Sequence, residues 1–500
     1  MYVNTIALQL PSSLGTLTAA ELREIADNHG SPYTGDYNNV FGPLRPRAVE
    51  NSLEAMARDV LQSLSDSLVT NGVEPSHLTL RQIADALYGR PNTDPGGPTA
   101  FKILEALMQT NTMSYEDFSK IATHMHKHTP ASGKVEIAYF DGQGVIGFKN
   151  AKKAFPHQYA RFLIGVGGFH EHAHTLFAFT EMFDAAIGRF TIDFLHPPVP
   201  NEISRVQKVT NNLEHNAYRH HQNAHHVRTL AFVAYLLQDV VNPPPRLLLQ
   251  RGLDAYQAHV ETAGGIVMLE YLRGAGFPAI QWQRCARGGT GRFMVELFAY
   301  SLHIYRSVCH KPVAAQVALI AILGFECCLP ALRAVLFATT SLSLLGRSGA
   351  NMYIDRVLEY VNNIQQGSKG NSSAASFGKA LDMTTLLRPM MHVRHAFQAT
   401  EAGSADGDDP ITQSMLIQAR LLQDEIRRIL GTDLTLVRPN NPFHHTGNAV
   451  PLDGGSLRER QPWEFWKRVA HGRSTGKGRS RLEAWSLYVR RFVFDHFFRF

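Results

Sequence analysis

The stretch Val135–His170, VEIAYFDGQGVIGFKNAKKAFPHQYARFLIGVGGFH, decides the fold prediction, because the helical pattern before it changes here to a strand pattern. Val135–Phe140 alternates β-branched and aromatic residues and ends at Asp141-Gly142. This pattern predicts a strand followed by a tight turn. Ala151–Phe155 is expected to be helical, and Ala160–Val166 is expected to form a second strand.

Helical patterns dominate the residues before this stretch. Thr18–Asn28 opens with a T-A-A-E capping box, and Ala48–Thr70 repeats apolar residues at a helical period. Ala100–Thr110 and Tyr115–His128 are expected to be two more short helices.

Helical patterns also follow the stretch. Phe169–Phe190 and Asn211–Val241 are expected to be helices, with Phe190–Leu195 as a candidate third strand between them. Val313–Leu345 is nearly continuous apolar sequence, but Pro330 divides it into two pieces that are each too short to span a bilayer. We interpret it as a buried helical hairpin and expect no membrane insertion.

Composition narrows the class of protein. The 500 residues suggest two or three domains, and 44% hydrophobic with 18% charged residues excludes wholesale disorder. Four cysteines in 500 residues exclude a disulfide scaffold, and because they form no C-x-x-C pair, we expect no cysteine zinc site. A reducing, intracellular location fits this cysteine usage best.

The positive charge is concentrated at the end of the chain. Ser456–Phe500 holds eleven Lys/Arg residues and four Asp/Glu residues, interleaved with aromatic residues. Such a segment favours loose, salt-sensitive binding of nucleic acid, although a solvated surface loop is the alternative. The candidate contacts are Arg473, Lys477, Arg479 and Arg481.

Two acidic positions are candidates for metal binding. Asp141 follows a predicted strand, where α/β sheets present metal-binding carboxylates. Much later, Asn351–Gln366 is expected to be a helix that carries Asp355, Glu359, Asn362 and Asn363 on one face. A carboxylate with an amide one turn away is suited to hold a divalent ion and orient a water or phosphate. Taken singly, each position also fits an ordinary solvent-facing polar residue.

The order of these residues resembles transposases of the Mutator-like group. In that family a catalytic Asp leads an A-x-x-x-F-P segment, a C-x-x-H-type element follows, and the last acid lies in an E-x-x-N helix. The matching residues here are Asp141, Ala151, Phe155, Pro156, His170, Glu359 and Asn362. The chain also looks like uncharacterised eukaryotic proteins associated with mobile elements. The resemblance covers about residues 132–370.

The resemblance implies an RNase H-like core with a helical insertion. In such enzymes Mg²⁺ or Mn²⁺ ions bound by three carboxylates drive attack at a phosphodiester. The sequence departs from the family pattern in having no strand-borne acid before Asp141 and no Cys in the C-x-x-H position. A second registration takes Asp141 as the first acid and Asp193 as the second. A decayed relative without strand-transfer activity is the third alternative.

Histidine is abundant, with 24 residues, and it clusters. Neutral imidazoles and carboxylates at helical spacing are suitable ligands for Zn, Fe or Mn, whereas hydrogen-bonded core histidines are the structural alternative. The candidate metal ligands are His170, Glu171, His174, Glu214, His221 and His225.

A second candidate contact with nucleic acid is a glycine-rich loop, Arg284–Arg292. Its arginines Arg284, Arg287 and Arg292 are candidates for a phosphate cradle, although it lacks the spacing of a P-loop.

The combined prediction is a predominantly helical α+β protein. We expect helices over 1–130, an RNase H-like core remnant over 131–210 and 346–436, a helical insertion over 211–345 and a basic aromatic tail over 437–500. The leading functional hypothesis is a transposon-derived DNA-binding protein, nuclear in location, with a metal-dependent DNA-cleaving core. The alternatives are a non-catalytic helical interaction protein that forms homo-oligomers and a His/carboxylate metalloprotein.

Overall fold

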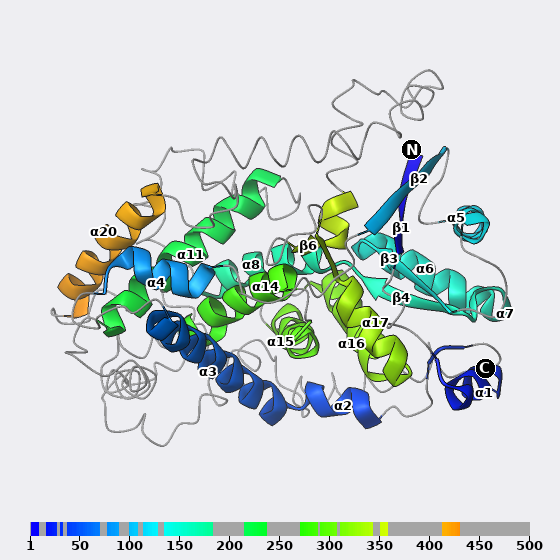
Figure 1. Cartoon of the computed structure of the whole chain (residues 1–500), viewed down its shortest axis with the longest axis horizontal. Helices are drawn as coiled ribbons and strands as arrows, with labels where there is room; N and C mark the ends of the chain where they lie inside the picture. Colours follow the sequence, from blue (N-terminus) through cyan, green and yellow to red (C-terminus); the bar gives the residue numbers. More distant parts are fainter. Residues whose placement is uncertain are drawn as a thin grey trace, which may run out of the picture.

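The protein is predominantly helical, with three small two-stranded sheets in its described part (Figure 1). The architecture is that of a computed structural model. It describes residues 2–9, 17–27, 31–33, 38–70, 78–89, 100–108, 114–128, 135–183, 215–237, 271–288, 291–307, 311–343, 351–358 and 413–430.

A parallel strand pair forms the unit that the sequence predicted around Asp141. Strands β3 (Glu136–Phe140) and β4 (Phe162–Val166) pair in parallel, so that Phe140 lies beside Val166. Helices α6 (Gly142–Ala154) and α7 (Pro156–Tyr159) connect them. Both predicted strands are therefore confirmed. Because the two strands are parallel, their carboxyl ends lie at the same edge of the sheet.

A long helix follows this unit directly. Helix α8 (Gly168–Phe183) begins two residues after β4 and confirms the predicted helical period as far as residue 183. The candidate strand Phe190–Leu195 lies outside the described residues.

The other two sheets are antiparallel and were not predicted, and the helix expected over Asn351–Gln366 is a strand at its beginning, Asn351–Tyr353. Strand β1 (Tyr2–Gln9) pairs with β2 (Ala100–Met108), and β5 (Ser341–Ser343) pairs with β6 (Asn351–Tyr353). The prediction of a helix over Ala100–Thr110 is therefore wrong. Its Ala, Lys, Leu and Glu residues favour a helix locally, but pairing with a strand almost one hundred residues earlier overrides that preference.

The strand pair lies with α6 and α7 towards the right of Figure 1, and most of the other helices pack together beside it, towards the left. Helix α6 packs on α5 and α16, whereas α3 packs on α4 and α14, and α11 packs on α4, α8 and α20. The bounds are α1 (Ala19–Asp27), α2 (Asn38–Leu44), α3 (Pro46–Thr70), α4 (Leu80–Tyr88), α5 (Tyr115–His128), α11 (His215–Leu237), the π-helix η4 (Leu272–Gly276), α14 (Phe277–Gly288), α15 (Met294–Ser307), α16 (Pro312–Glu326), α17 (Pro330–Thr339) and α20 (Gln413–Leu430).

The apolar segment Val313–Leu345 begins with two successive helices, as predicted, but its end is not helical, because Ser341–Ser343 forms β5. Helix α16 buries eleven of its residues, and α17 begins at Pro330, where the fixed φ of proline suits the first helical position. Within the part of the chain that is described, no helix has both the length and the apolar character needed to cross a membrane.

One hydrophobic core joins regions that the sequence assigned to separate domains. It runs from Tyr33 through α3, β4, α8, α11, α14, α15 and α16 to Ile426 in α20. Helix α3 of the predicted N-terminal region packs directly on α14 of the predicted insertion. The two regions therefore share a core instead of burying separate ones.

Candidate functional site

The carboxyl edge of the β3–β4 pair carries an exposed acid. Asp141 is the N-cap of α6, and its Oδ1 accepts a hydrogen bond from the backbone N–H of Gly144 at 2.9 Å. The side chain is otherwise exposed to solvent. One carboxylate oxygen therefore caps the helix, while the other is accessible at the edge of the sheet.

Two glycines extend this edge towards β6. The N–H of Gly167 donates to the carbonyl of Phe140 at 3.2 Å, so the turn after β4 lies beside the end of β3. A Cβ at Gly167 would lie 2.4 Å from the Cγ of Asp355, and one at Gly168 would lie 2.5 Å from the ring of Tyr353. No larger residue fits at either position without a shift of its neighbour.

Asp355 accepts hydrogen bonds from the beginning of α8, although it lies 185 positions later in the chain than His170. Its two oxygens accept the backbone N–H groups of Phe169 and His170, each at 3.0 Å, and the Nδ1 of His170 lies 3.0 Å from Oδ2. Because an ionised carboxylate only accepts hydrogen bonds, Nδ1 is the donor in that pair. The positive end of the helix dipole also favours a carboxylate at this place. We call these contacts the Asp355 clamp.

The predicted catalytic acids are only partly described. Asp141 lies at the strand edge, as expected, whereas Glu359, Asn362 and Asp193 lie outside the described residues. The pairing of Asp141 with Glu359 therefore stays a prediction. The described residue that joins the edge is Asp355, which the sequence placed on the same helical face as Glu359 without assigning it a role. The Gly-Gly pair before α8 was the signal for it, since such a turn admits a close neighbour.

The predicted ligands at the start of α8 have separate surroundings. His170 belongs to the Asp355 clamp. Glu171 is buried, and this burial raises the pKa of its carboxyl group to about 8 despite a hydrogen bond from Tyr305. Burial, with a smaller effect of Lys311, lowers the pKa of His174 to about 4. At neutral pH, Glu171 is therefore mainly protonated and His174 is neutral.

The histidines of α11 are bound by hydroxyl groups. His221 and His225 both contact the Oγ1 of Thr180, at 2.9 and 3.2 Å, and Nδ1 of His225 lies 2.7 Å from the hydroxyl of Tyr271. Burial lowers the pKa of His225 well below its usual value. These contacts are those of hydrogen-bonded core histidines, and the lowered pKa keeps His225 neutral.

A buried histidine that the sequence did not single out lies near them. The ring of His172 stacks on Trp282 at 5.8 Å, and its Nδ1 lies 3.3 Å from the hydroxyl of Tyr218. Burial lowers the pKa of His172 to about 3. Across all described residues, no group of three His, Cys, Asp or Glu side chains is placed to hold a metal ion. Glu214 lies outside that part of the chain, so the complete histidine set stays a prediction.

The three arginines of the glycine-rich segment make internal contacts. Arg284 donates to Ser63 at 3.0 Å, Arg287 to the carbonyl of Tyr88 at 3.0 Å, and Arg292 lies 2.8 Å from Asp59. They tie α14 and the residues that follow it to α3 and α4. These contacts account for the three arginines without a phosphate ligand.

The basic tail lies outside the part of the chain that the structure describes. Arg473, Lys477, Arg479 and Arg481 lie outside the described residues, so their role in binding nucleic acid stays a prediction.

Comparisons of the chain with protein-family models, with curated proteins and with solved structures find no match.

Proposed function

We propose that the chain is a nucleic-acid-processing protein derived from a mobile element, with an RNase H-like core that cleaves DNA in a metal-dependent reaction. The observation that carries this proposal is the β3–α6–β4 unit, whose carboxyl edge presents Asp141 to solvent. Open α/β sheets bind their ligands at the carboxyl ends of the strands, which is where Asp141 lies.

The Asp355 clamp supports the proposal from the other half of the chain. It fastens the segment that leads to Glu359 against the turn that follows β4. That turn is bonded to Phe140, the residue before Asp141. Asp355, four positions before the last proposed acid, thus lies at the same edge as Asp141, which supports the pairing of Asp141 with Glu359 that the resemblance implies.

The metal-binding set needs residues beyond the described part of the chain. Asp141 supplies one accessible carboxylate oxygen, and the described residues contain no complete group of three ligands. The full set would therefore require Glu359 together with Asp193 or a further acid. Mg²⁺ or Mn²⁺ at such a set would supply the charge that stabilises a phosphodiester under attack.

A cleavage assay with three variants tests the proposal. Purified full-length protein is incubated with labelled duplex and single-stranded DNA in Mg²⁺ or Mn²⁺, alongside Asp141→Asn, Glu359→Gln and the control Asp85→Asn. Asparagine caps a helix as well as aspartate does, so Asp141→Asn removes a metal ligand and leaves α6 intact. Asp85 is an exposed acid on α4 that pairs with Arg81.

The expected result is cleavage by the wild type and by Asp85→Asn, and loss of cleavage in the other two variants. Undiminished cleavage by Asp141→Asn would contradict the assignment of the strand edge. Absence of cleavage in the wild type with both metals would contradict a catalytic core.

The proposed DNA-binding role of the tail has its own test. If Arg473, Lys477, Arg479 and Arg481 each neutralise one phosphate, removing residues 437–500 reduces the slope of log K against log salt by about 3.6. An unchanged slope in a fluorescence-anisotropy titration would reject this role. A nuclear location follows only if DNA binding holds.

A further inference from the structure

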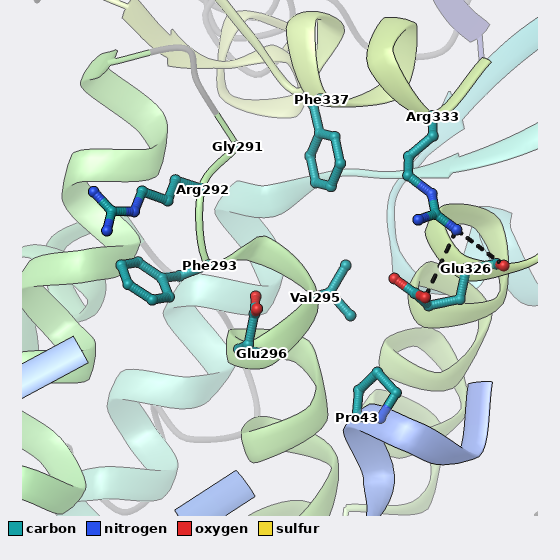
Figure 2. A pocket seen from close by; sticks show the side chains of 9 residues that line it. All are labelled: Pro43, Gly291, Arg292, Phe293, Val295, Glu296, Glu326, Arg333 and Phe337. Atoms are coloured by element: carbon teal, nitrogen blue, oxygen red, sulfur yellow. Dashed lines mark hydrogen bonds and ion pairs between the residues drawn. The ribbon is translucent and has the colours of Figure 1, made fainter. Parts of the chain in front are cut away.

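A cavity of about 250 Å³ lies between α2, α15 and α17, beside the end of α16 (Figure 2). Its lining includes no histidine and neither Asp141 nor Asp355. Its apolar walls are formed by Pro43, Phe293, Val295 and Phe337. The ring of Phe337 stacks on Phe325 at 4.7 Å between centroids, which gives that wall a fixed aromatic face.

The two arginines at the cavity are already paired. The guanidinium of Arg292 lies 2.8 Å from Asp59, and in Figure 2 it extends away from the centre of the cavity. Arg333 donates to the backbone carbonyl of Glu326 at 3.1 Å and lies 3.7 Å from its carboxylate. Neither arginine therefore supplies a free positive charge to the lining.

The remaining charged group is Glu296 in the first turn of α15. Figure 2 shows its carboxylate directed into the space that Phe337 and Glu326 border. Within the part of the chain that the structure describes, Glu296 makes no hydrogen bond and no ion pair. Both arginines of the lining are thus committed to carboxylates, Arg292 to Asp59 and Arg333 to Glu326, whereas Glu296 has no partner among the described residues.

The Glu326 carboxylate also responds to the charge of Glu296, although burial and Arg333 have larger effects on it. Burial raises the pKa of the Glu326 carboxyl group, Arg333 opposes this rise, and the nearby Glu296 adds to it. Helix α16 ends at Glu326, so the negative end of its dipole lies at the cavity as well. Glu296, Glu326 and the end of α16 would each favour a positive charge in the cavity, and the beginning of α15 would oppose it.

We propose that this cavity binds a small organic cation, a primary ammonium or guanidinium group on a short apolar or aromatic body. The cationic group contacts Glu296, and the apolar body lies against Phe337 and Val295. Cavities for drug-sized ligands usually measure about 300–1,000 Å³, so the ligand is smaller than these. The site is independent of the proposed cleavage activity.

Calorimetric titration of the full-length protein with benzylammonium tests this site. Benzyl alcohol and benzoate, which share its ring but differ in charge, are titrated in parallel. The test variant is Glu296→Gln, and the matched control is Glu116→Gln. Glu116 is likewise exposed to the helix dipole, because it lies in the first turn of a helix of 14 residues, the same length as α15.

We expect saturable binding of benzylammonium to the wild type and to Glu116→Gln, and an affinity at least about tenfold lower in Glu296→Gln. Benzyl alcohol and benzoate should bind more weakly than benzylammonium. Three results would each overturn the proposal: no saturation in the wild type at millimolar benzylammonium, equal affinity in Glu296→Gln, or equal affinity for benzyl alcohol.

Discussion

Replacing Asp355 by asparagine should loosen the start of α8. The carboxylate accepts two backbone N–H groups and the His170 ring, all at 3.0 Å, and its side chain is 5% exposed. Asparagine has the same shape but only one accepting oxygen, and its NH₂ group must face a donor. At least one bond to a charged group is therefore lost and one buried donor is left unsatisfied.

The size of the effect follows from these contacts. Hydrogen bonds to charged groups contribute about 1.5–3 kcal/mol, and an unsatisfied buried donor costs about 1–3 kcal/mol. Together they predict a loss of about 3–5 kcal/mol at the clamp, the range seen when one partner of a buried pair is removed. A loss of about 3 kcal/mol corresponds to roughly a 150-fold faster exchange of the protected amides.

Hydrogen exchange followed by mass spectrometry measures this directly. Peptides that span 162–176 contain the amides of Phe169 and His170 and should exchange faster in Asp355→Asn than in the wild type. Peptides from α3 report whether the change is local. Asp141→Asn is the control, since either residue caps α6 equally well and its exchange should match the wild type. If the peptides over 162–176 exchange at the same rate in Asp355→Asn as in the wild type, the clamp is refuted.

Three further variants test other parts of the structure by urea unfolding. Burial raises the folded pKa of Glu171 from 4.5 to about 8, so the wild type should lose stability relative to Glu171→Gln as pH rises between these values, by about 1.4 kcal/mol per pH unit; a constant difference would contradict the assigned pKa. Burial lowers the folded pKa of Lys152 from 10.5 to about 7, so the wild type should gain stability relative to Lys152→Met as pH rises through that interval, and parallel pH profiles would contradict it. Gly167→Ala should cost about 1–3 kcal/mol because its Cβ would meet Asp355, whereas Gly142→Ala, whose Cβ would meet only Val317 at 3.8 Å, should have a much smaller effect; equal effects would refute the crowding argument.

The elements that were predicted correctly have strong local signals. The capping box at Thr18 forms as expected, with its hydroxyl accepting from Glu21 N–H at 3.2 Å and the Glu21 carboxylate accepting from Thr18 N–H at 2.8 Å. In α3 the apolar positions from Leu53 to Leu68 are buried, as their period predicted. In both cases the deciding contacts lie within one or two helical turns, or on one face of one helix.

The elements that were missed depend on distant partners. Strand β2 forms against β1, and β6 forms against β5, each in a register that no local pattern of β2 or β6 specifies. The clamp is of the same kind, because the sequence around Asp355 does not identify a partner 185 positions earlier. The local sequence predicted that Asp141 lies at the end of a strand, but it did not indicate that Asp355 packs against the same edge.

The distance along the chain between the two halves of the clamp bears on biosynthesis. A ribosome that adds about 5–20 residues per second needs roughly 10–40 s to extend the nascent chain from His170 to Asp355. During that interval the amides at the start of α8 are made but lack their acceptor, and α14, which α3 packs against, is still being synthesised. The protein therefore completes its interior late in translation, a period in which chaperones would have to shield the apolar faces of its early helices.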